Sequence, residues 1–152
     1  MPIENFKKED TIGFLLGRTH RVMSNQMKRR FAEAGHDLTQ EQMIVLITLW
    51  SEDGCSQQRL ADLMFKEKSS VTRLITNIEK RNLVLRVPDQ NDRRNKLIYL
   101  THQGKALKEE VMEIIFEMLD KAQANISETD LNTCKNVLRQ IFKNFAGKEI
   151  TE

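Results

Sequence analysis

The stretch from Ser56 to Thr101 reads SQQRLADLMFKEKSSVTRLITNIEKRNLVLRVPDQNDRRNKLIYLT and decides the fold of this chain. A short helical pattern over 56–64 is followed by a polar break over 65–68 and then by a second helical pattern, Ser69 to Arg81. The apolar residues of the second pattern recur at the spacing of one buried helical stripe. They are Val71, Leu74, Ile75 and Ile78. The pattern therefore predicts two helices joined by a tight turn.

A basic hairpin is predicted directly after these helices. Two β-rich runs, Leu83–Val87 and Lys96–Leu100, are joined by a charged tip over residues 88–95. Helix, turn, helix and hairpin in this order predict a mainly α (α+β) fold, a winged helix-turn-helix with a two-stranded wing.

The polar face of the second helix is a candidate DNA-contacting surface. If the apolar stripe faces inward, short hydroxyl and cationic side chains point outward at 100° per residue. They are Ser69, Thr72, Arg73, Thr76 and Lys80. Because recognition helices contact bases with their N-terminal part, Ser69, Ser70, Thr72 and Arg73 are the base-contact candidates. The alternative is that this face is only the solvated side of an amphipathic helix.

The hairpin tip adds a second candidate DNA contact. Arg93 and Arg94 are adjacent there and are flanked by Asp89 and Asp92. An arginine on a projecting wing can enter a narrow minor groove. We expect one of these aspartates, Asp89 or Asp92, to hold a guanidinium in place by a charge-assisted fork. The alternative is a solvated surface loop with an ordinary ion pair.

Positive charge is concentrated in this part of the chain. The segment from Arg59 to Lys96 has ten Lys and Arg against five Asp and Glu, a net charge of +5. Because the whole chain carries +2, the rest of the chain carries −3. A basic module within a nearly neutral chain is typical of a protein that binds phosphate backbones.

These residues resemble the multiple antibiotic resistance regulator (MarR) family. The matching motifs are VTRL at 71–74, EKRNLV at 79–84, D..DRR at 89–94 and LT..G at 100–104. One departure is Asn82, where a glycine is common in the family, but asparagine also tolerates the left-handed conformation. The resemblance implies a bacterial, ligand-responsive transcriptional regulator, more often a repressor than an activator. Two oddly spaced cysteines and the lack of a signal-peptide pattern predict a reducing cytoplasm.

Long helices are predicted on both sides of this module. The expected helices cover 11–34, a stretch opened by a Thr39–Gln42 capping box, about 101–125, and a last stretch capped by Ser127. The expected buried sides of the second and last of these are Met43, Ile44, Leu46, Ile47 and Trp50, and Leu131, Cys134, Leu138, Ile141, Phe142 and Phe145. Only the ends, about 1–8 and 147–152, are expected to be loose.

A single domain over residues 1–152 is expected, with a winged-helix core at about 37–100. The resemblance implies that the flanking segments, about 9–35 and 101–146, pair with a second copy as a homodimer. A two-fold protein of this kind binds a pseudo-palindrome. The alternative is that these helices close a monomeric core.

Other functions have little support in the sequence. The chain has no Gly-rich phosphate loop and no CxxC or HExxH spacing, so neither an enzyme, a metal site nor a cofactor is expected. Cys55 is expected to be accessible in a loop, and Cys134 to be a small core residue. No apolar run approaches the length of a membrane span.

The resemblance also implies a small-molecule effector in a cleft beside the dimer helices. Phe14, Arg18, Arg21 and Trp50 are the candidate effector contacts, although amphipathic helices present such residues to any neighbour. Two other interpretations stay open: a protein-interaction module that does not bind DNA, and a non-specific nucleoid-type binder.

Overall fold

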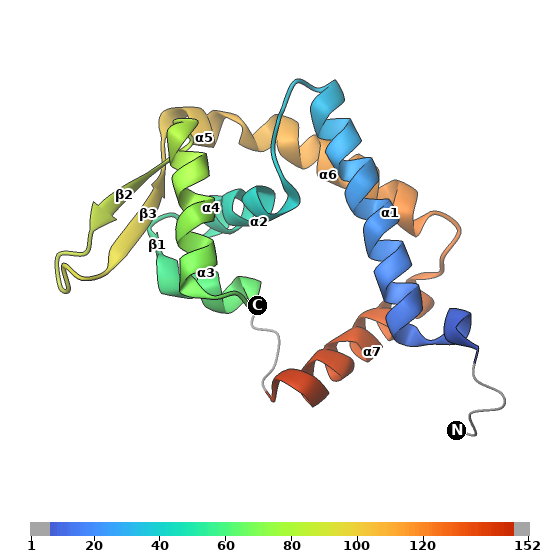
Figure 1. Ribbon diagram of the computed structural model, residues 1–152. Helices are drawn as coiled ribbons and strands as arrows, with labels where there is room; N and C mark the ends of the chain where they lie inside the picture. The colour runs from blue at the N-terminus through green and yellow to red at the C-terminus, as the bar shows by residue number, and fades with distance from the viewer. Residues whose placement is uncertain (1–6, 148–152) are drawn as a thin grey trace. The chain divides into compact units, whose positions relative to one another are not determined.

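Residues 7–147 are described by the computed structural model (Figure 1). The chain consists of two compact units, Met1–Gln40 and Glu41–Glu152. Of the predicted loose ends, residues 1–6 and 148–152 lie outside the described residues. Lys8 instead belongs to a short 3-10 helix, η2 (Lys8–Asp10), and Gly147 caps the last helix.

The first unit is built around one long helix, α1 (Ile12–Glu33). Thr11 caps it by accepting a hydrogen bond from the Phe14 amide at 3.4 Å, and Gly35 follows its end at φ +81°. The predicted helix over 11–34 is therefore confirmed. Most of its large apolar side chains are exposed to solvent: Ile12, Leu15, Leu16, Val22 and Met23. Phe31 is the only residue of α1 that is buried.

The second unit contains the helix-turn-helix, α3 (Gln57–Met64) and α4 (Lys68–Lys80), beside α2 (Gln40–Ser51). Ser56 caps α3 by accepting from the Arg59 amide at 3.0 Å. Phe65 then turns the chain in the left-handed conformation, at φ +51°. All of the predicted apolar stripe of α4 is buried: Val71, Leu74, Ile75 and Ile78.

The buried side of α2 is only partly as predicted. Met43 and Leu46 are buried, but Ile44 is 39% exposed, and Ile47 and Trp50 are half-buried. Val45 and Leu49, which were not predicted, are buried as well. Because almost every residue from 43 to 50 is apolar, the hydrophobic pattern could not fix which side of this helix faces the core.

The wing belongs to a three-stranded antiparallel sheet in the order β1-β3-β2. β2 (Val84–Pro88) pairs with β3 (Lys96–Leu100), with Arg86 opposite Ile98. These two strands project as the predicted hairpin (Figure 1). The third strand, β1 (Cys55–Ser56), pairs with β3 and was not predicted, because two residues are too few to form a recognisable alternation.

Tight backbone contacts join the hairpin to the next helix. Asn82 adopts φ +57°, the left-handed conformation that was expected of it. Thr101 donates its hydroxyl to the Asn82 carbonyl at 2.7 Å and caps α5 (His102–Ala106) by accepting from the Gly104 amide. A Cβ atom at Gly104 would lie 2.1 Å from the Leu83 carbonyl oxygen, so only glycine fits this position without movement of the backbone.

The C-terminal part differs from the prediction in two respects. The helix expected over 101–125 is divided at Leu107 into α5 and α6 (Lys108–Gln123). The last helix, α7 (Glu128–Ala146), begins at its predicted Ser127 cap, but none of its residues is buried. Its predicted apolar face is exposed or half-buried, with Phe145 90% exposed.

The two cysteines are placed opposite to expectation. Cys134 is exposed on α7, since the apolar stripe that contains it is not covered within this chain. Cys55 is 3% exposed, because β1 places it in the sheet instead of an open loop. Among residues 7–147, no helix combines the length and the apolar character that crossing a membrane requires.

Candidate nucleic-acid interface

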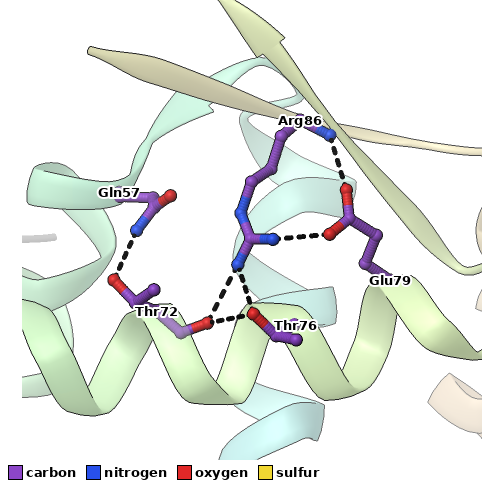
Figure 2. Close-up of polar contacts among 5 residues, drawn as sticks. All are labelled: Gln57, Thr72, Thr76, Glu79 and Arg86. Carbon is purple, nitrogen blue, oxygen red and sulfur yellow. Dashed lines mark hydrogen bonds and ion pairs between the residues drawn. The ribbon is translucent and has the colours of Figure 1, made fainter. Parts of the chain in front are cut away.

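Two polar stripes run along α4. Ser69, Ser70, Arg73 and Lys80 are exposed, and no other side chain of the described chain hydrogen-bonds or pairs with them. Thr72 and Thr76, by contrast, hydrogen-bond to neighbouring elements (Figure 2). The structure thus divides the predicted outward face into an open stripe and a stripe that is tied to the rest of the module.

Thr72 links α4 to both α3 and the wing. Its hydroxyl accepts a hydrogen bond from the Gln57 amide at 2.9 Å and donates to the Lys68 carbonyl. Its own carbonyl oxygen accepts from Arg86 Nη2 at 2.9 Å. Gln57 is only 7% exposed, so this contact satisfies a buried amide.

Arg86, on β2, is the centre of the second set of contacts (Figure 2). Its Nη1 pairs with the Glu79 carboxylate, and its Nη2 donates to the Thr76 hydroxyl at 2.8 Å. The Arg86 backbone amide also donates to Glu79 Oε1 at 3.3 Å. Sequence reasoning missed Glu79, Arg86 and Gln57. A usable signal existed, because Thr72, Thr76 and Glu79 recur at i, i+4, i+7 on one helix face.

Asp92 shapes the wing tip in a way that differs from the prediction. Its carboxylate accepts from the Arg94 backbone amide at 3.0 Å and from the Asn95 side chain at 3.3 Å. Among residues 7–147, no guanidinium pairs with Asp92. The expected fork was wrong, because an aspartate in a turn finds the backbone amide two residues on more readily than a flexible side chain. Arg93 and Arg94 are both exposed.

The cations of the module fall into two groups. Arg59 pairs with Glu52, Lys66 with Glu41 and Arg86 with Glu79, and Arg81 also has a partner. Within residues 7–147, no acidic group pairs with the remaining six of the ten, and all six are exposed. They are Lys68, Arg73 and Lys80 on α4, and Arg93, Arg94 and Lys96 on the wing. Within residues 59–96, the uncompensated positive charge therefore lies on α4 and the hairpin.

The predicted effector contacts are found in both units. In the first unit Arg18 lies over the Phe14 ring, 5.6 Å from its centroid, and Arg21 is exposed. In the second unit the Trp50 indole donates to the Gly104 carbonyl at 3.0 Å. A cavity of about 310 Å³ lies within the first unit, and none of these four residues lines it.

The remaining chemistry of the described chain is sparse. Across residues 7–147, no three His, Cys, Asp or Glu side chains are grouped as a metal site would need. Burial raises the pKa of the Cys55 thiol to about 11, and the nearby Glu52 adds to this effect. A thiol in that state is a poor nucleophile.

Comparison with known proteins gives a consistent result. The sequence pattern of the MarR family matches residues 38–96. The chain is 33% identical over 115 residues to the HTH-type transcriptional regulator SarZ of Staphylococcus aureus, covering 75% of this chain and 76% of that protein. Homologues of this chain are thus transcriptional regulators.

Two solved structures have the same fold. CouR from Rhodococcus jostii RHA1, bound to p-coumaroyl-CoA, is 26% identical with a TM-score of 0.76, covering 88% of this chain and 92% of that one. A MarR-type regulator from Listeria monocytogenes, complexed with a 26mer DNA, has a TM-score of 0.81 at 23% identity, with 91% of each chain covered. The second likeness concerns the fold alone.

The wing, the recognition helix and the relatives agree with one another. MarR regulators bind DNA as dimers. Among the ten cations of residues 59–96, the six without an acidic partner lie on the two elements with which a winged helix approaches a duplex. The chain belongs to the MarR family and is a DNA-binding transcriptional regulator.

Proposed function

We propose that this protein is a ligand-responsive repressor that binds a pseudo-palindromic operator as a homodimer. The observation that carries the proposal is that the six unpaired, exposed cations of residues 59–96 all lie on α4 and the wing. Such charges release counterions from DNA when they meet phosphates, which supplies affinity. A regulator also needs groups that contact base edges, and the open stripe of α4 offers them.

The candidate contacts divide by groove. Ser69, Ser70 and Arg73, near the start of α4, approach base edges in the major groove, where Arg73 can bind guanine bidentately. Thr72 lies beside them, and because its hydroxyl is bonded to Gln57 and to the Lys68 carbonyl, it offers its methyl group to a base. Lys80 lies further along the helix and faces the DNA backbone. Thr76 acts indirectly, because its hydroxyl is bonded to Arg86 and to the Thr72 carbonyl. Arg93 and Arg94 reach the adjacent minor groove from the wing tip. Asp92 acts indirectly, since its carboxylate holds the turn that presents both arginines.

Dimerisation follows from the uncovered apolar faces of the terminal helices. α1 exposes Ile12 at 53% and Val22 at 62%, and α7 exposes Val137 at 46% and Phe145 at 90%. Apolar area of this kind is normally covered by a partner. We assign residues of about 9–35 and 101–146 to dimerisation and 37–100 to the DNA-binding core. A two-fold dimer then reads half-sites about 34–36 Å apart.

Effector response is proposed on the basis of a relative that was solved with a ligand. CouR was solved with p-coumaroyl-CoA bound. Phe14, Arg18, Arg21 and Trp50 stay the candidate contacts in this chain. A ligand lowers operator affinity if it binds better to the spacing of the two recognition helices that DNA does not accept. The proposal makes the protein a non-catalytic regulator that works in the bacterial cytoplasm.

Selection of binding sites from fragmented genomic DNA of the source organism tests this function. Affinity for the enriched sequence is then measured as salt is raised. Enrichment of a short palindrome, bound at least about 10³-fold more tightly than random DNA, supports the proposal. Equal binding to all DNA supports a non-specific nucleoid-type binder. No binding, with the purified protein free of ligand, supports a protein-interaction module.

A further inference from the structure

The wing and the recognition helix are joined by one arginine. Arg86 lies on β2, and its guanidinium and backbone amide bind three residues of one α4 stripe, Thr72, Thr76 and Glu79 (Figure 2). Every one of these hydrogen bonds has a charged partner, either the Arg86 guanidinium as donor or the Glu79 carboxylate as acceptor. Charge-assisted bonds of this sort are about twice as strong as neutral ones and are directional.

Arg86 differs from the cations that are available to DNA. Its side chain is 20% exposed, and its charge is neutralised by Glu79. Both of its terminal nitrogens already donate to α4. A side chain in this state has no free charge to place on a phosphate, whereas Arg73 and Arg94 do.

We propose that Glu79 and Arg86 form a brace that sets the pose of the wing relative to the recognition helix, so that Arg94 and Arg73 reach the two grooves together. This inference rests on the proposed DNA-binding function. Glu79 and Arg86 are positioning residues, since they act through the wing and do not touch DNA. Pre-organisation of this kind raises affinity because less conformational freedom is lost when DNA binds.

Glu79 provides a test in which the two explanations differ in sign. A carboxylate in a basic module repels phosphates, so neutralising it tightens DNA binding if charge is its only effect. If Glu79 holds the wing, its neutralisation loosens the hairpin and weakens binding instead. Direction alone therefore separates positioning from bulk electrostatics.

The experiment compares Glu79→Gln with Glu67→Gln in titrations against the selected operator at fixed salt. Glu67 lies at the other end of α4, is exposed, and its side chain caps no backbone amide, so it is a matched control for the loss of one negative charge. We expect Glu79→Gln to weaken binding about fivefold or more, as the loss of a wing contact would. Glu67→Gln should bind as well as the wild type or better. Glu79→Gln binding equal to or tighter than the wild type would overturn the brace.

A double variant identifies the route of the effect. In the Arg94→Ala background the wing has lost its main contact, so adding Glu79→Gln should change affinity by less than about twofold. The same fivefold loss in that background would mean that Glu79 acts elsewhere than through the wing. Thr76→Val, nearly isosteric and without the hydroxyl, should give a smaller loss of the same kind and serves if Glu79→Gln is unstable.

Amide hydrogen exchange on the free protein keeps the brace testable even if no operator is found. Because the Arg86 amide donates to Glu79, Glu79→Gln should speed exchange within residues 84–88, while Glu67→Gln should not. Unchanged exchange would refute the brace whatever the DNA result. Faster exchange in a protein that binds no DNA would refute the proposed function and leave the brace as a structural contact.

Discussion

Replacing Arg94 with alanine removes a charged side chain that makes no contact stabilising the fold. The Arg94 side chain is exposed and unpaired, and only its backbone amide is held, by Asp92 Oδ1 at 3.0 Å. The fold should therefore be unaffected. Loss of a good groove contact costs at least about 1 kcal/mol. A dimer loses two such contacts, so operator affinity should fall by about 2 kcal/mol, or about thirtyfold.

Salt dependence gives the same variant a second readout. Each cation removed from the interface lowers the slope of log K against log salt by about 0.9, so two wings should lower it by about 2. Fluorescence anisotropy titrations between about 50 and 200 mM salt measure both quantities. Arg139→Ala, an exposed arginine of α7 bonded only to Asn136, removes the same charge and is the control. If Arg94→Ala matches Arg139→Ala in affinity and slope, the wing has no part in binding.

Three further substitutions have distinct expected outcomes. Arg73→Ala should reduce discrimination between the operator and a scrambled site by about 1–3 kcal/mol in competition assays, and equal losses on both sequences would limit Arg73 to phosphate contact. Gly104→Ala places a Cβ 2.1 Å from the Leu83 carbonyl oxygen and should lower the free energy of unfolding by about 1–3 kcal/mol. Urea unfolding at constant protein concentration measures this, and an unchanged midpoint would refute the steric argument. In Cys134→Ser the remaining thiol, Cys55, is buried and its pKa is raised to about 11. It should therefore react slowly with a disulfide reagent near neutral pH and faster as the pH rises toward that value. Rapid labelling of the native protein near neutral pH would contradict its burial.

The DNA-binding core was largely predictable because its signals are local. The buried stripe of α4 follows a strict helical period, and the hairpin strands begin and end within a residue of their predicted bounds. β1 was missed because a two-residue strand is defined only by its partner, here Ile98 and Leu97. The break at Leu107 carries no proline or glycine, so nothing local predicted it.

The last helix, α7, was predicted in position but not in burial. Apolar periodicity indicates that a face is to be covered, but it does not say whether the cover comes from the same chain. Cys134 illustrates this, since it lies on the apolar stripe of α7 and is nevertheless exposed. The same reasoning that misplaced Cys134 in a core supports the dimer, because the stripe still needs a partner.

In the candidate site, the helical wheel identified the outward residues of α4. It could not separate those that are open to solvent from those that are bonded to a neighbouring element. Thr72 and Thr76 have the same angular relation to the core as open residues do. Only the position of β2 shows that their polar atoms are already bonded. A wheel describes one helix, and hydrogen-bond partners come from another element.

Arg86 and Arg94 show how partners decide the role of a residue type. In sequence, Arg94 has an aspartate two residues away, whereas the nearest acidic residue to Arg86 is Asp89, which does not pair with it. In the structure Asp92 binds the Arg94 backbone and leaves its guanidinium open, while Glu79 crosses from α4 to neutralise Arg86. A turn brings a carboxylate to the nearest amide, and packing of a strand on a helix brings distant charges together. The arginine with the close acidic neighbour is therefore the one available to DNA, and the other holds the wing.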